Sequence, residues 1–167
     1  MSFASFVLAL VTMQRLGELV LARHNTARLL ARGAIEVGAS HYPLLVAMHA
    51  AWLTALWIYG YGQPVEPLAL TGFIALQALR WWVLATLGPR WTTRIIVLPA
   101  EPRVTNGPYR YIAHPNYVVV AAEIALLPLA LHLPWLALIF SVLNAVMLTI
   151  RIRAESHALA ATGGRAA

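Results

Sequence analysis

Long apolar runs separated by short polar segments constrain the fold of this chain more than any other feature. A helix needs roughly 20 mainly apolar residues to cross the hydrocarbon core of a bilayer, and several runs of this length occur along the sequence. Hydrophobic residues make up 60% of the chain and charged residues only 11%, whereas a typical soluble domain carries about 25% charged residues. The sequence therefore predicts an all-α integral membrane protein, with residues 1–167 forming one domain.

The last apolar run, from residue 117 to residue 150, is too long for a single crossing. As one helix it would extend about 51 Å, and the hydrocarbon core is about 30 Å thick. His132, Leu133 and Pro134 lie near its middle, and proline suits the first turn of a helix better than its interior. We therefore expect two short helices joined as a hairpin at this break. The five expected spans are residues 3–22, 41–60, 67–86, 117–131 and 134–150.

Arginine alternates between the two sides of these five crossings. It is abundant after the first, third and fifth spans, and absent from the connections at residues 60–66 and 132–134. Because arginine is enriched on the cytoplasmic side of membranes, we expect the N-terminus outside and the C-terminus inside. The net charge of +6 then reflects topology, and we expect no nucleic-acid partner. The arginines concerned are Arg23, Arg28, Arg32, Arg90, Arg94, Arg103, Arg110, Arg151, Arg153 and Arg165.

Four ionisable residues interrupt the expected spans, where charged groups usually face protein or water. They are Arg15, Glu18, Arg80 and Glu123. One interpretation is that Arg15 and Glu18, which share a helix face, pair with each other or reach the membrane surface, and that Arg80 also reaches the surface. The other is that all four line a polar cavity open to the cytoplasm. The sequence leaves both interpretations open.

The segment from Val104 to Tyr117 places polar and aromatic residues between two apolar runs. Asn106, Gly107 and Pro108 form a turn signal, and Pro115 suits the first turn of the following helix. Free backbone N–H groups at that helix start can receive a carboxylate, and tyrosine rings can face a cation or a purine. The segment is either a ligand clamp or an interfacial belt of tyrosines that anchors the helix end.

A second polar cluster follows the last span. Arg151 and Glu155 lie four residues apart on one helix face, where they form either part of a site or a solvated ion pair. The chain has no cysteine and no glycine-rich phosphate motif, and its histidines lack the His-Glu-x-x-His spacing. We therefore expect neither a conventional dinucleotide-binding fold nor a metal site.

Two of these segments together resemble a known family. The stretches "GPYRYIAHPNY" from Gly107 and "RIRAE" from Arg151 are similar to paired C-terminal motifs of the isoprenylcysteine carboxyl methyltransferase family. Upstream, "RLGELVLARHN" from Arg15 and "GAIEVGASHY" from Gly33 look like its small bacterial branch, which includes O-methyltransferases of alkylpyrones and related polyketide lipids. The resemblance implies an integral membrane enzyme that uses S-adenosylmethionine without a Rossmann domain.

The resemblance also implies roles for individual residues. Glu155 matches a glutamate that holds the cofactor, and Arg151 matches an arginine directed toward the substrate. Two departures are visible, because Ala113 stands where the family often has arginine and Ser156 stands where it often has a second glutamate. The first puts a supporting ion pair in doubt, and the second puts a second acidic role in doubt. The other implied cofactor-binding residues are Arg103, Val104, Tyr109, His114, Pro115, Asn116 and Tyr117.

The implied reaction moves a methyl group from S-adenosylmethionine to a carboxylate or acidic hydroxyl of a lipophilic substrate, such as an isoprenylcysteine-like or alkylpyrone-like lipid. Arg151 would orient an anionic acceptor, whereas a phenol or an amine would need a base, for which His114 and Glu123 are candidates. We expect this cofactor pocket, without a metal, on the cytoplasmic side of a bacterial inner membrane and in contact with membrane lipids.

Other functions are compatible with the same sequence. A phospholipid or amine N-methyltransferase would use a similar His-Pro motif. Sterol reductases share part of the C-terminal pattern but use a nicotinamide cofactor and are usually much longer. A small membrane transporter or a non-catalytic assembly subunit would use the four charged residues of the spans as a permeation path. Binding of S-adenosylhomocysteine separates a methyltransferase from a transporter.

Overall fold

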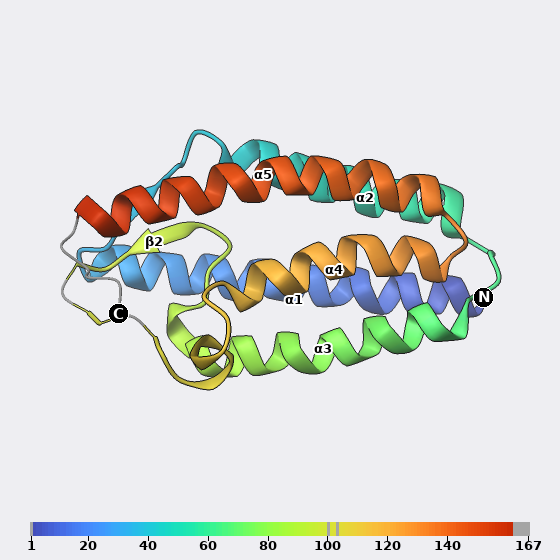
Figure 1. Ribbon diagram of the computed structural model, residues 1–167, viewed down its shortest axis with the longest axis horizontal. Helices are drawn as coiled ribbons and strands as arrows, with labels where there is room; N and C mark the ends of the chain where they lie inside the picture. The colour runs from blue at the N-terminus through green and yellow to red at the C-terminus, as the bar shows by residue number, and fades with distance from the viewer. Residues whose placement is uncertain (1, 100, 103, 162–167) are drawn as a thin grey trace.

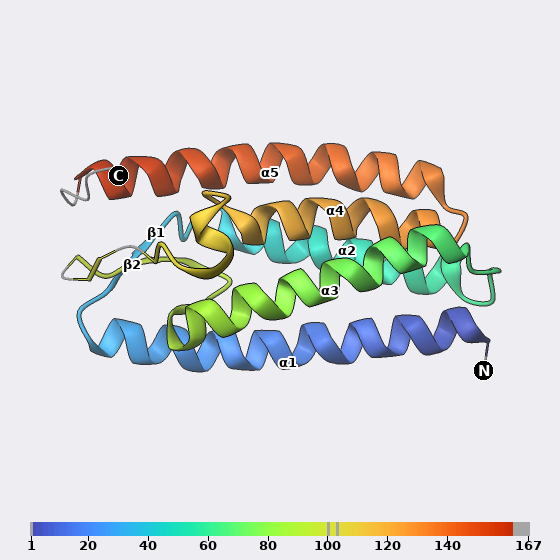
Figure 2. The ribbon, with the colours of Figure 1, turned by 60° about the horizontal axis from the view of Figure 1, so that its bottom comes forward.

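Five α-helices run side by side along one axis and form a bundle (Figures 1 and 2). The computed structural model describes residues 2–99, 101–102 and 104–161, with side chains described as far as residue 158. The helices are α1 (Phe3–Ala31), α2 (Tyr42–Gly60), α3 (Pro67–Leu87), α4 (Pro115–Ala130) and α5 (Pro134–Ala161). The bundle confirms the all-α prediction.

Two short strands and two short 3₁₀ helices occupy one end of the bundle (Figure 1). They are β1 (Ile35–Val37), β2 (Ile95–Val97), η1 (Gly88–Arg90) and η2 (Gly107–Arg110). The strands are antiparallel, and Glu36 lies opposite Ile96. The sequence did not predict this strand pair, because each strand is too short to show an alternating pattern.

Local sequence signals explain where several helices begin. The Ser2 hydroxyl accepts a hydrogen bond from the backbone N–H of Ser5 at 3.1 Å and caps α1. The Glu66 carboxylate caps α3 and accepts from the backbone N–H groups of Ala69 at 2.6 Å and Leu68 at 3.1 Å. These two bonds hold the pKa of Glu66 below its ordinary value. Helices α2, α3 and α4 also carry proline in their first turn, where its missing N–H removes no helical bond.

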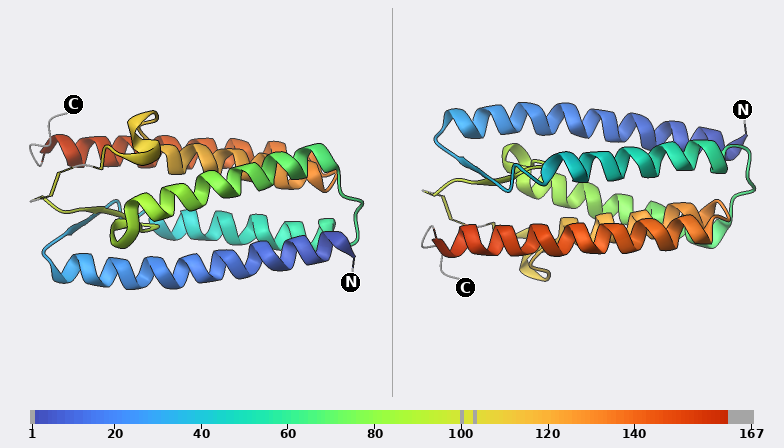
Figure 3. Two further views of the ribbon diagram at one scale, coloured as in Figure 1. Left: turned by 90° about the horizontal axis from the view of Figure 1, so that it is seen from below. Right: turned by 90° about the horizontal axis from the view of Figure 1, so that it is seen from above.

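The chain connections bring the arginine-rich segments to one end of the bundle, which we call the arginine-rich end. Helix α1 begins at the opposite end, and α5 finishes at the arginine-rich end (Figure 3). The α1–α2 connection and the long segment between α3 and α4 lie at the arginine-rich end, whereas the α2–α3 and α4–α5 turns lie at the other. The alternation predicted from arginine is therefore present. Which end faces the cytoplasm stays a prediction.

The outer surface of the bundle is apolar, as expected of an integral membrane protein. Leu68 is 79% exposed and Leu138 is 67% exposed, and helices that are apolar on all sides are typical of a membrane. Within the described residues, four helices are long and apolar enough to cross a bilayer, and α4, with 16 residues, is shorter. Helix α4 lies between α3 and α5 and packs against both (Figure 2). The fifth predicted crossing therefore depends on this short helix.

The break between α4 and α5 occurs at the predicted position. His132 has a φ of 55°, in the left-handed region where many helices end, and the N–H of Leu133 donates to the carbonyl of Pro128 at 2.9 Å. The two helices form the expected hairpin, but the expectation that both are short is wrong. Helix α5 has 28 residues and packs against both strands.

Helix α1 also continues beyond its expected span, which ended at residue 22. Its last turns carry Arg23 and Arg28 on the surface, while Asn25 points inward and is only 3% exposed. The Asn25 amide donates to the carbonyl of Trp91 at 2.8 Å and to that of Gly88 at 3.3 Å. These bonds tie the extension of α1 to the segment that follows α3.

Two clusters of buried apolar side chains hold the bundle together. The larger cluster joins all five helices through residues that include Leu8, Trp52, Leu56, Phe73, Leu127 and Leu136. The smaller cluster lies near the arginine-rich end and consists of Ala22, Val83, Leu84 and Trp91, with Leu87 and Tyr109 packed against it. The smaller cluster thus connects α1 and α3 to η2, where the predicted site residues begin.

The four ionisable residues of the expected spans form one buried ion-pair network between α1, α3 and α4. Arg15 pairs with Glu18 at 3.0 Å and with Glu123 at 2.9 Å. Arg80 pairs with the same two glutamates, at 2.5 Å and 2.7 Å, and Gln77 donates to Glu123 at 2.7 Å. Two arginines thus balance two glutamates, which favours the interpretation of mutual pairing over a polar cavity. The expectation that Arg80 reaches the membrane surface is wrong, because its side chain is buried in these pairs.

Candidate functional site

A cavity of about 890 Å³ lies at the arginine-rich end, where the connections between helices gather (Figures 2 and 3). Pockets that bind small molecules typically measure about 300–1,000 Å³. Its lining comes from the ends of α1 and α3, from β2, from residues 98–99, 101–102 and 104–105, from η2, and from the facing ends of α4 and α5. Seven residues predicted from the sequence line it together: Val104, Tyr109, His114, Asn116, Tyr117, Arg151 and Glu155. Arg103, also predicted, lies outside the described residues.

The start of α4 meets the last turns of α5 at one wall of this cavity. The Tyr117 hydroxyl donates to Oε2 of Glu155 at 2.8 Å, and Nδ1 of His114 lies 3.8 Å from the same oxygen. The rings of His114 and Tyr117 are stacked, with centroids 5.3 Å apart. Pro115 is buried outside the cavity lining, and its place in the first turn of α4 sets where His114 and Tyr117 stand. Both contacts use Oε2, so Oε1 of Glu155 stays outside them.

Arg151 is a buried cation, only 5% exposed, that makes no ion pair with any described carboxylate. Its guanidinium donates to the carbonyl of Thr93 at 3.0 Å and lies 5.8 Å from the centroid of the Tyr117 ring. A buried charge without a counter-charge carries a desolvation penalty of several kcal/mol. The solvated pair of Arg151 and Glu155 is therefore not formed, and the site favours binding of an anion beside Arg151.

Strand β2 and the residues before it form a second wall that the sequence did not predict, and β1 supports this wall from outside the lining. Arg94, directly before β2, pairs with Glu36 of β1 at 2.6 Å and lies 4.3 Å from the centroid of the Tyr42 ring. The hydroxyls of Tyr42 and Thr93 are 3.0 Å apart, and the Thr93 carbonyl receives the bond from Arg151. Residues of α2, β1, β2 and α5 thus support one another around Arg151.

Glu101 belongs to the part of the chain before η2 that lines the cavity. Its carboxylate pairs with Arg32, directly after α1, and lies 3.6 Å from Nε of Arg90 in η1. Each of these exposed pairs contributes little by itself. Together they attach Glu101 to the end of α1 and to η1.

Tyr109 and Asn116 bring further polar atoms to the cavity. Burial, together with the negative charge of Glu155, raises the pKa of Tyr109 to about 12, so its hydroxyl stays protonated near neutral pH. The side-chain oxygen of Asn116 is buried and has no hydrogen-bond partner within the described part of the chain. Leaving such a group unsatisfied costs about 1–3 kcal/mol, a cost that a ligand with a donor group can relieve.

The two positions that depart from the family pattern have different surroundings. Ala113 is exposed and lines the cavity next to His114. Ser156 is also exposed but does not belong to the cavity lining. The position of a second family glutamate therefore lies outside this cavity, whereas the position of the family arginine lies at its edge.

Of the two residues named as candidate bases, only His114 lines the cavity. Glu123 is 2% exposed, and its carboxylate accepts bonds from Arg15, Arg80 and Gln77 in the ion-pair network. The prediction of Glu123 as a base is therefore not supported, because all its contacts are internal. Among the described residues, no group of three or more His, Cys, Asp or Glu side chains is placed to hold a metal ion.

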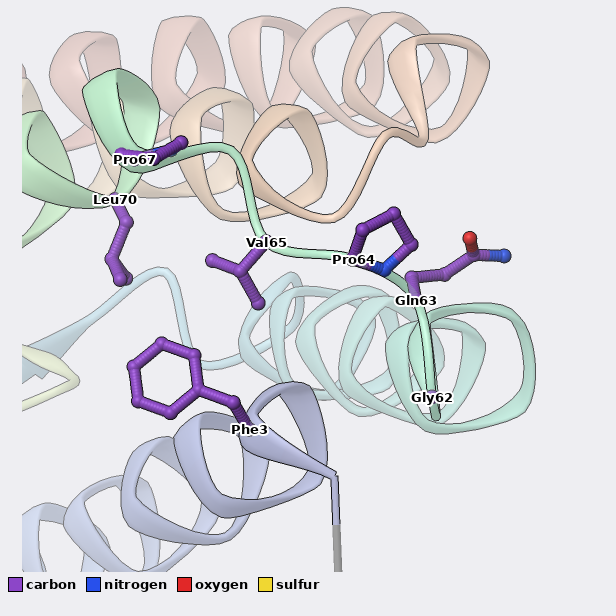
Figure 4. Close-up of a pocket in the computed structure, with 7 residues that line it drawn as sticks. All are labelled: Phe3, Gly62, Gln63, Pro64, Val65, Pro67 and Leu70. Atoms are coloured by element: carbon purple, nitrogen blue, oxygen red, sulfur yellow. The ribbon is translucent and has the colours of Figure 1, made fainter.

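A second hollow, of about 530 Å³, lies at the opposite end of the bundle. Figure 4 shows Phe3 of α1, Val65 of the α2–α3 turn and Leu70 of α3 pointing toward one another. None of the residues that line this hollow is titratable. Its lining is mainly apolar, with Gln63 as the polar side chain, and the candidate site is the cavity at the arginine-rich end.

Comparison with known proteins adds independent information. The model of a family described as "Isoprenylcysteine carboxyl methyltransferase (ICMT) family" matches residues 68–161. The "Uncharacterized protein YpbQ" of Bacillus subtilis (strain 168) is 39% identical over 158 residues, which cover 92% of this chain and 94% of that protein. An "Uncharacterized protein" of Haemophilus influenzae is 26% identical over 165 residues, covering 95% and 96%. No solved structure gives a significant match.

Proposed function

This chain belongs to the isoprenylcysteine carboxyl methyltransferase family, and we propose that it moves a methyl group from S-adenosylmethionine to an oxygen atom of a lipophilic substrate. The family is one of membrane methyltransferases, which agrees with the apolar helices of the bundle. The observation that carries the proposal is Arg151, a buried cation without a described counter-charge, at the wall of a cavity that Glu155 also lines.

The charge of the cavity supports an anionic acceptor. Four arginines line it, against two glutamates. Glu101 is paired with Arg32 and Arg90, and Arg94 is paired with Glu36 outside the lining, so Arg110 and Arg151 remain against Glu155. A cationic amine would be repelled by this surplus of positive charge, whereas a carboxylate or an ionised hydroxyl would be attracted. The arginines of the lining are Arg90, Arg94, Arg110 and Arg151.

The cofactor carries a positive charge and hydrogen-bond donors, and other side chains of the same cavity can bind these groups. Glu155 has one carboxylate oxygen outside its contacts with Tyr117 and His114, and this oxygen can accept from hydroxyl groups. The rings of Tyr109 and Tyr117 offer faces that attract a cation. The unpartnered oxygen of Asn116 can accept from an amino group. These donors and acceptors fit S-adenosylmethionine, which carries a sulfonium, ribose hydroxyls and amino groups.

The reaction makes modest demands on the protein. When bound, S-adenosylmethionine supplies a methyl group that its positive sulfur has already activated. The side chains must align the acceptor with that methyl group and keep water away. Arg151 binds and orients the acceptor oxygen through paired N–H donors. His114 can hold the proton of an acceptor that arrives un-ionised, and its neighbour Glu155, at 3.8 Å, stabilises that charge.

The location of the site suits a substrate that lies in a membrane. The cavity contains apolar side chains such as Leu29, Leu87 and Ile112 next to the charged ones, and the bundle below it has an apolar surface. A lipophilic methyl acceptor reaches the cavity from the lipid, while the water-soluble cofactor reaches it from the aqueous side. By the positive-inside rule, that side is the cytoplasm, at the inner membrane of a bacterium.

The proposal is tested by comparing Arg151→Ala with Arg153→Ala in purified protein. Arg153 lies two residues after Arg151 in α5 and is exposed, so its removal controls for general effects of a lost arginine. We expect Arg151→Ala to lower methyl transfer at least about thirtyfold, corresponding to the loss of one buried charged contact of about 2 kcal/mol. Its affinity for S-adenosylhomocysteine, measured by isothermal titration calorimetry, is expected to change less than about threefold, and Arg153→Ala to match wild type in both.

The methyl acceptor for this assay is identified first, in cells. Cells with and without the protein are grown on methionine that carries a trideuterated methyl group, and their lipids are compared by mass spectrometry. A lipid that gains the label only with the protein present is then the substrate. Failure of the wild-type protein to bind S-adenosylhomocysteine, or full activity of Arg151→Ala, would contradict the proposal.

A further inference from the structure

Trp91 lines the same cavity, although neither the sequence motifs nor the family resemblance pointed to it. The side chain is 2% exposed, and its indole N–H has no acceptor among the described residues. A buried donor without a partner costs about 1–3 kcal/mol, and buried tryptophans usually find a partner for this group. A ligand in the cavity is therefore the natural source of the missing acceptor.

Two hydrogen bonds fix the backbone of Trp91. Its carbonyl accepts from the Asn25 amide at 2.8 Å, and its backbone N–H donates to the carbonyl of Gly88 at 3.1 Å. Asn25 is itself buried and bonds to the Gly88 carbonyl as well. An indole on a backbone fixed in this way loses little further freedom when it binds a ligand, which favours specific recognition.

The core cluster that contains Trp91 is apolar and has no charged side chain. Trp91 packs in this smaller core cluster with Val83 and Leu84, and Tyr109 packs against the same cluster. Aliphatic groups and an aromatic ring beside a single N–H donor suit a flat heterocycle whose ring nitrogens accept hydrogen bonds. Two of the charged groups that line the cavity, Arg151 and Glu155, come from α5, an element that does not contribute to this cluster.

The cavity thus has an apolar part around Trp91 and a charged part around Arg151 and Glu155, and each part suits a different portion of the cofactor. We propose that Trp91 binds the adenine of the adenosyl group and donates its indole N–H to one of the adenine ring nitrogens. This inference rests on the proposed function. The adenine is the flat and uncharged part of that ligand, whereas the ribose hydroxyls and the charged amino-acid part match Glu155 and the polar wall. Asn116, whose buried oxygen lacks a donor, complements Trp91 by accepting from the amino group of the same ring.

The decisive comparison is between two tryptophans that undergo the same change. Trp91→Phe removes the N–H and keeps an aromatic ring. Trp52→Phe does the same in the larger core cluster, where the indole N–H is also buried without a described partner but does not line the cavity. We expect Trp91→Phe to weaken binding of S-adenosylhomocysteine about five- to tenfold in titration calorimetry, the value of one hydrogen bond. We expect Trp52→Phe to bind as wild type does.

A second measurement uses the ligand instead of the protein. S-adenosylhomocysteine analogues with one ring nitrogen replaced by carbon, at purine position 1, 3 or 7, are titrated into wild type and Trp91→Phe. One analogue is expected to lose about five- to tenfold in wild type and nothing further in Trp91→Phe, because both changes remove the same bond. Equal binding of all three analogues and the parent by wild type would overturn the assignment, even where the variant does not fold.

These results separate the two proposals from each other. Binding of S-adenosylhomocysteine by wild type, with no effect of Trp91→Phe, refutes the adenine subsite and leaves the methyltransferase proposal standing. Absence of binding by wild type refutes the methyltransferase proposal and the subsite with it. An equal loss in Trp91→Phe and Trp52→Phe would also count against the subsite, because it would show a general effect of losing an indole.

Discussion

The buried ion-pair network predicts an unusual rescue in which the loss of a second charge restores stability. Glu123→Gln removes one of two negative charges and leaves Arg15 and Arg80 with only Glu18 between them. Glu123 now accepts bonds at 2.9 Å from Arg15 and at 2.7 Å from both Arg80 and Gln77. The variant therefore carries a net positive charge in the apolar part of the bundle.

The magnitude follows from the burial of these groups. Glu123 and Arg80 have side chains 2% and 6% exposed, and removing one partner of such a buried pair costs about 3–5 kcal/mol. Adding Arg15→Gln makes the network neutral again and keeps the pair of Arg80 and Glu18, whose two bonds measure 2.5 Å and 2.6 Å. We expect the double variant to recover at least about 2 kcal/mol relative to Glu123→Gln alone.

The assay is thermal unfolding of the purified protein in detergent, followed by the fraction that remains monodisperse after heating. For a chain of this size, 1 kcal/mol shifts the melting temperature by about 2–4 °C, so Glu123→Gln is expected to melt roughly 6–12 °C lower for a loss of 3 kcal/mol. Glu36→Gln breaks the more exposed pair with Arg94 and serves as the contrast, with an expected loss below about 1 kcal/mol. A double variant no more stable than Glu123→Gln would refute the reasoning.

Two further predictions concern the turn before α4 and the phenol beside Glu155. Gly107→Ala is expected to lower the free energy of unfolding by at least about 1–2 kcal/mol, because φ is +57° there and an added Cβ would stand 2.4 Å from the Thr86 hydroxyl oxygen. Gly17→Ala, at a helical position with open space around it, is expected to raise it by up to about 1 kcal/mol, and the same melting assay checks both. The raised pKa of Tyr109, about 12 against 10.0, contributes stability that is complete below pH 10 and is lost as the pH rises toward 12. Tyr109→Phe is therefore expected to reduce the loss of stability over that range, and an unchanged alkaline melting profile would contradict this.

The network also bears on how the site is held. Its three helices include α4, whose first turn places His114 and Tyr117 at the cavity. Glu123 lies about two turns farther along the same helix. Pairing with α1 and α3 fixes the rotation of α4 about its axis, and so fixes the direction in which that first turn faces.

Much of the helical bundle could be predicted from local features of the sequence. Apolar runs of sufficient length predict the helices, and Pro115 and Pro134 mark where two of them begin. The break at His132 was predictable because a single helix of that length does not fit a bilayer. The alternation of arginine between connections was equally visible. These features need only composition, spacing and the properties of proline, so no tertiary contact is required to find them.

The candidate site was predictable only where a familiar motif marked it. His114, Asn116, Tyr117, Arg151 and Glu155 were expected from the resemblance, and the fold brings all five to one cavity. A motif does not reveal burial, however. The free charge of Arg151 and the lone oxygen of Asn116 became visible only with their surroundings.

Tertiary structure alone decided the remaining parts. The three-residue strands exist because each supplies the other's hydrogen bonds across some sixty residues of chain, and with them came the pairing of Arg94 with Glu36. Trp91 reached the cavity because Asn25, in an extension of α1 beyond its apolar run, holds its carbonyl. The four charges within the helices were evident from the sequence, but their partners were not. An opposite charge offsets the desolvation penalty of a buried charge, and the packing of α1, α3 and α4 determines which opposite charge lies within reach.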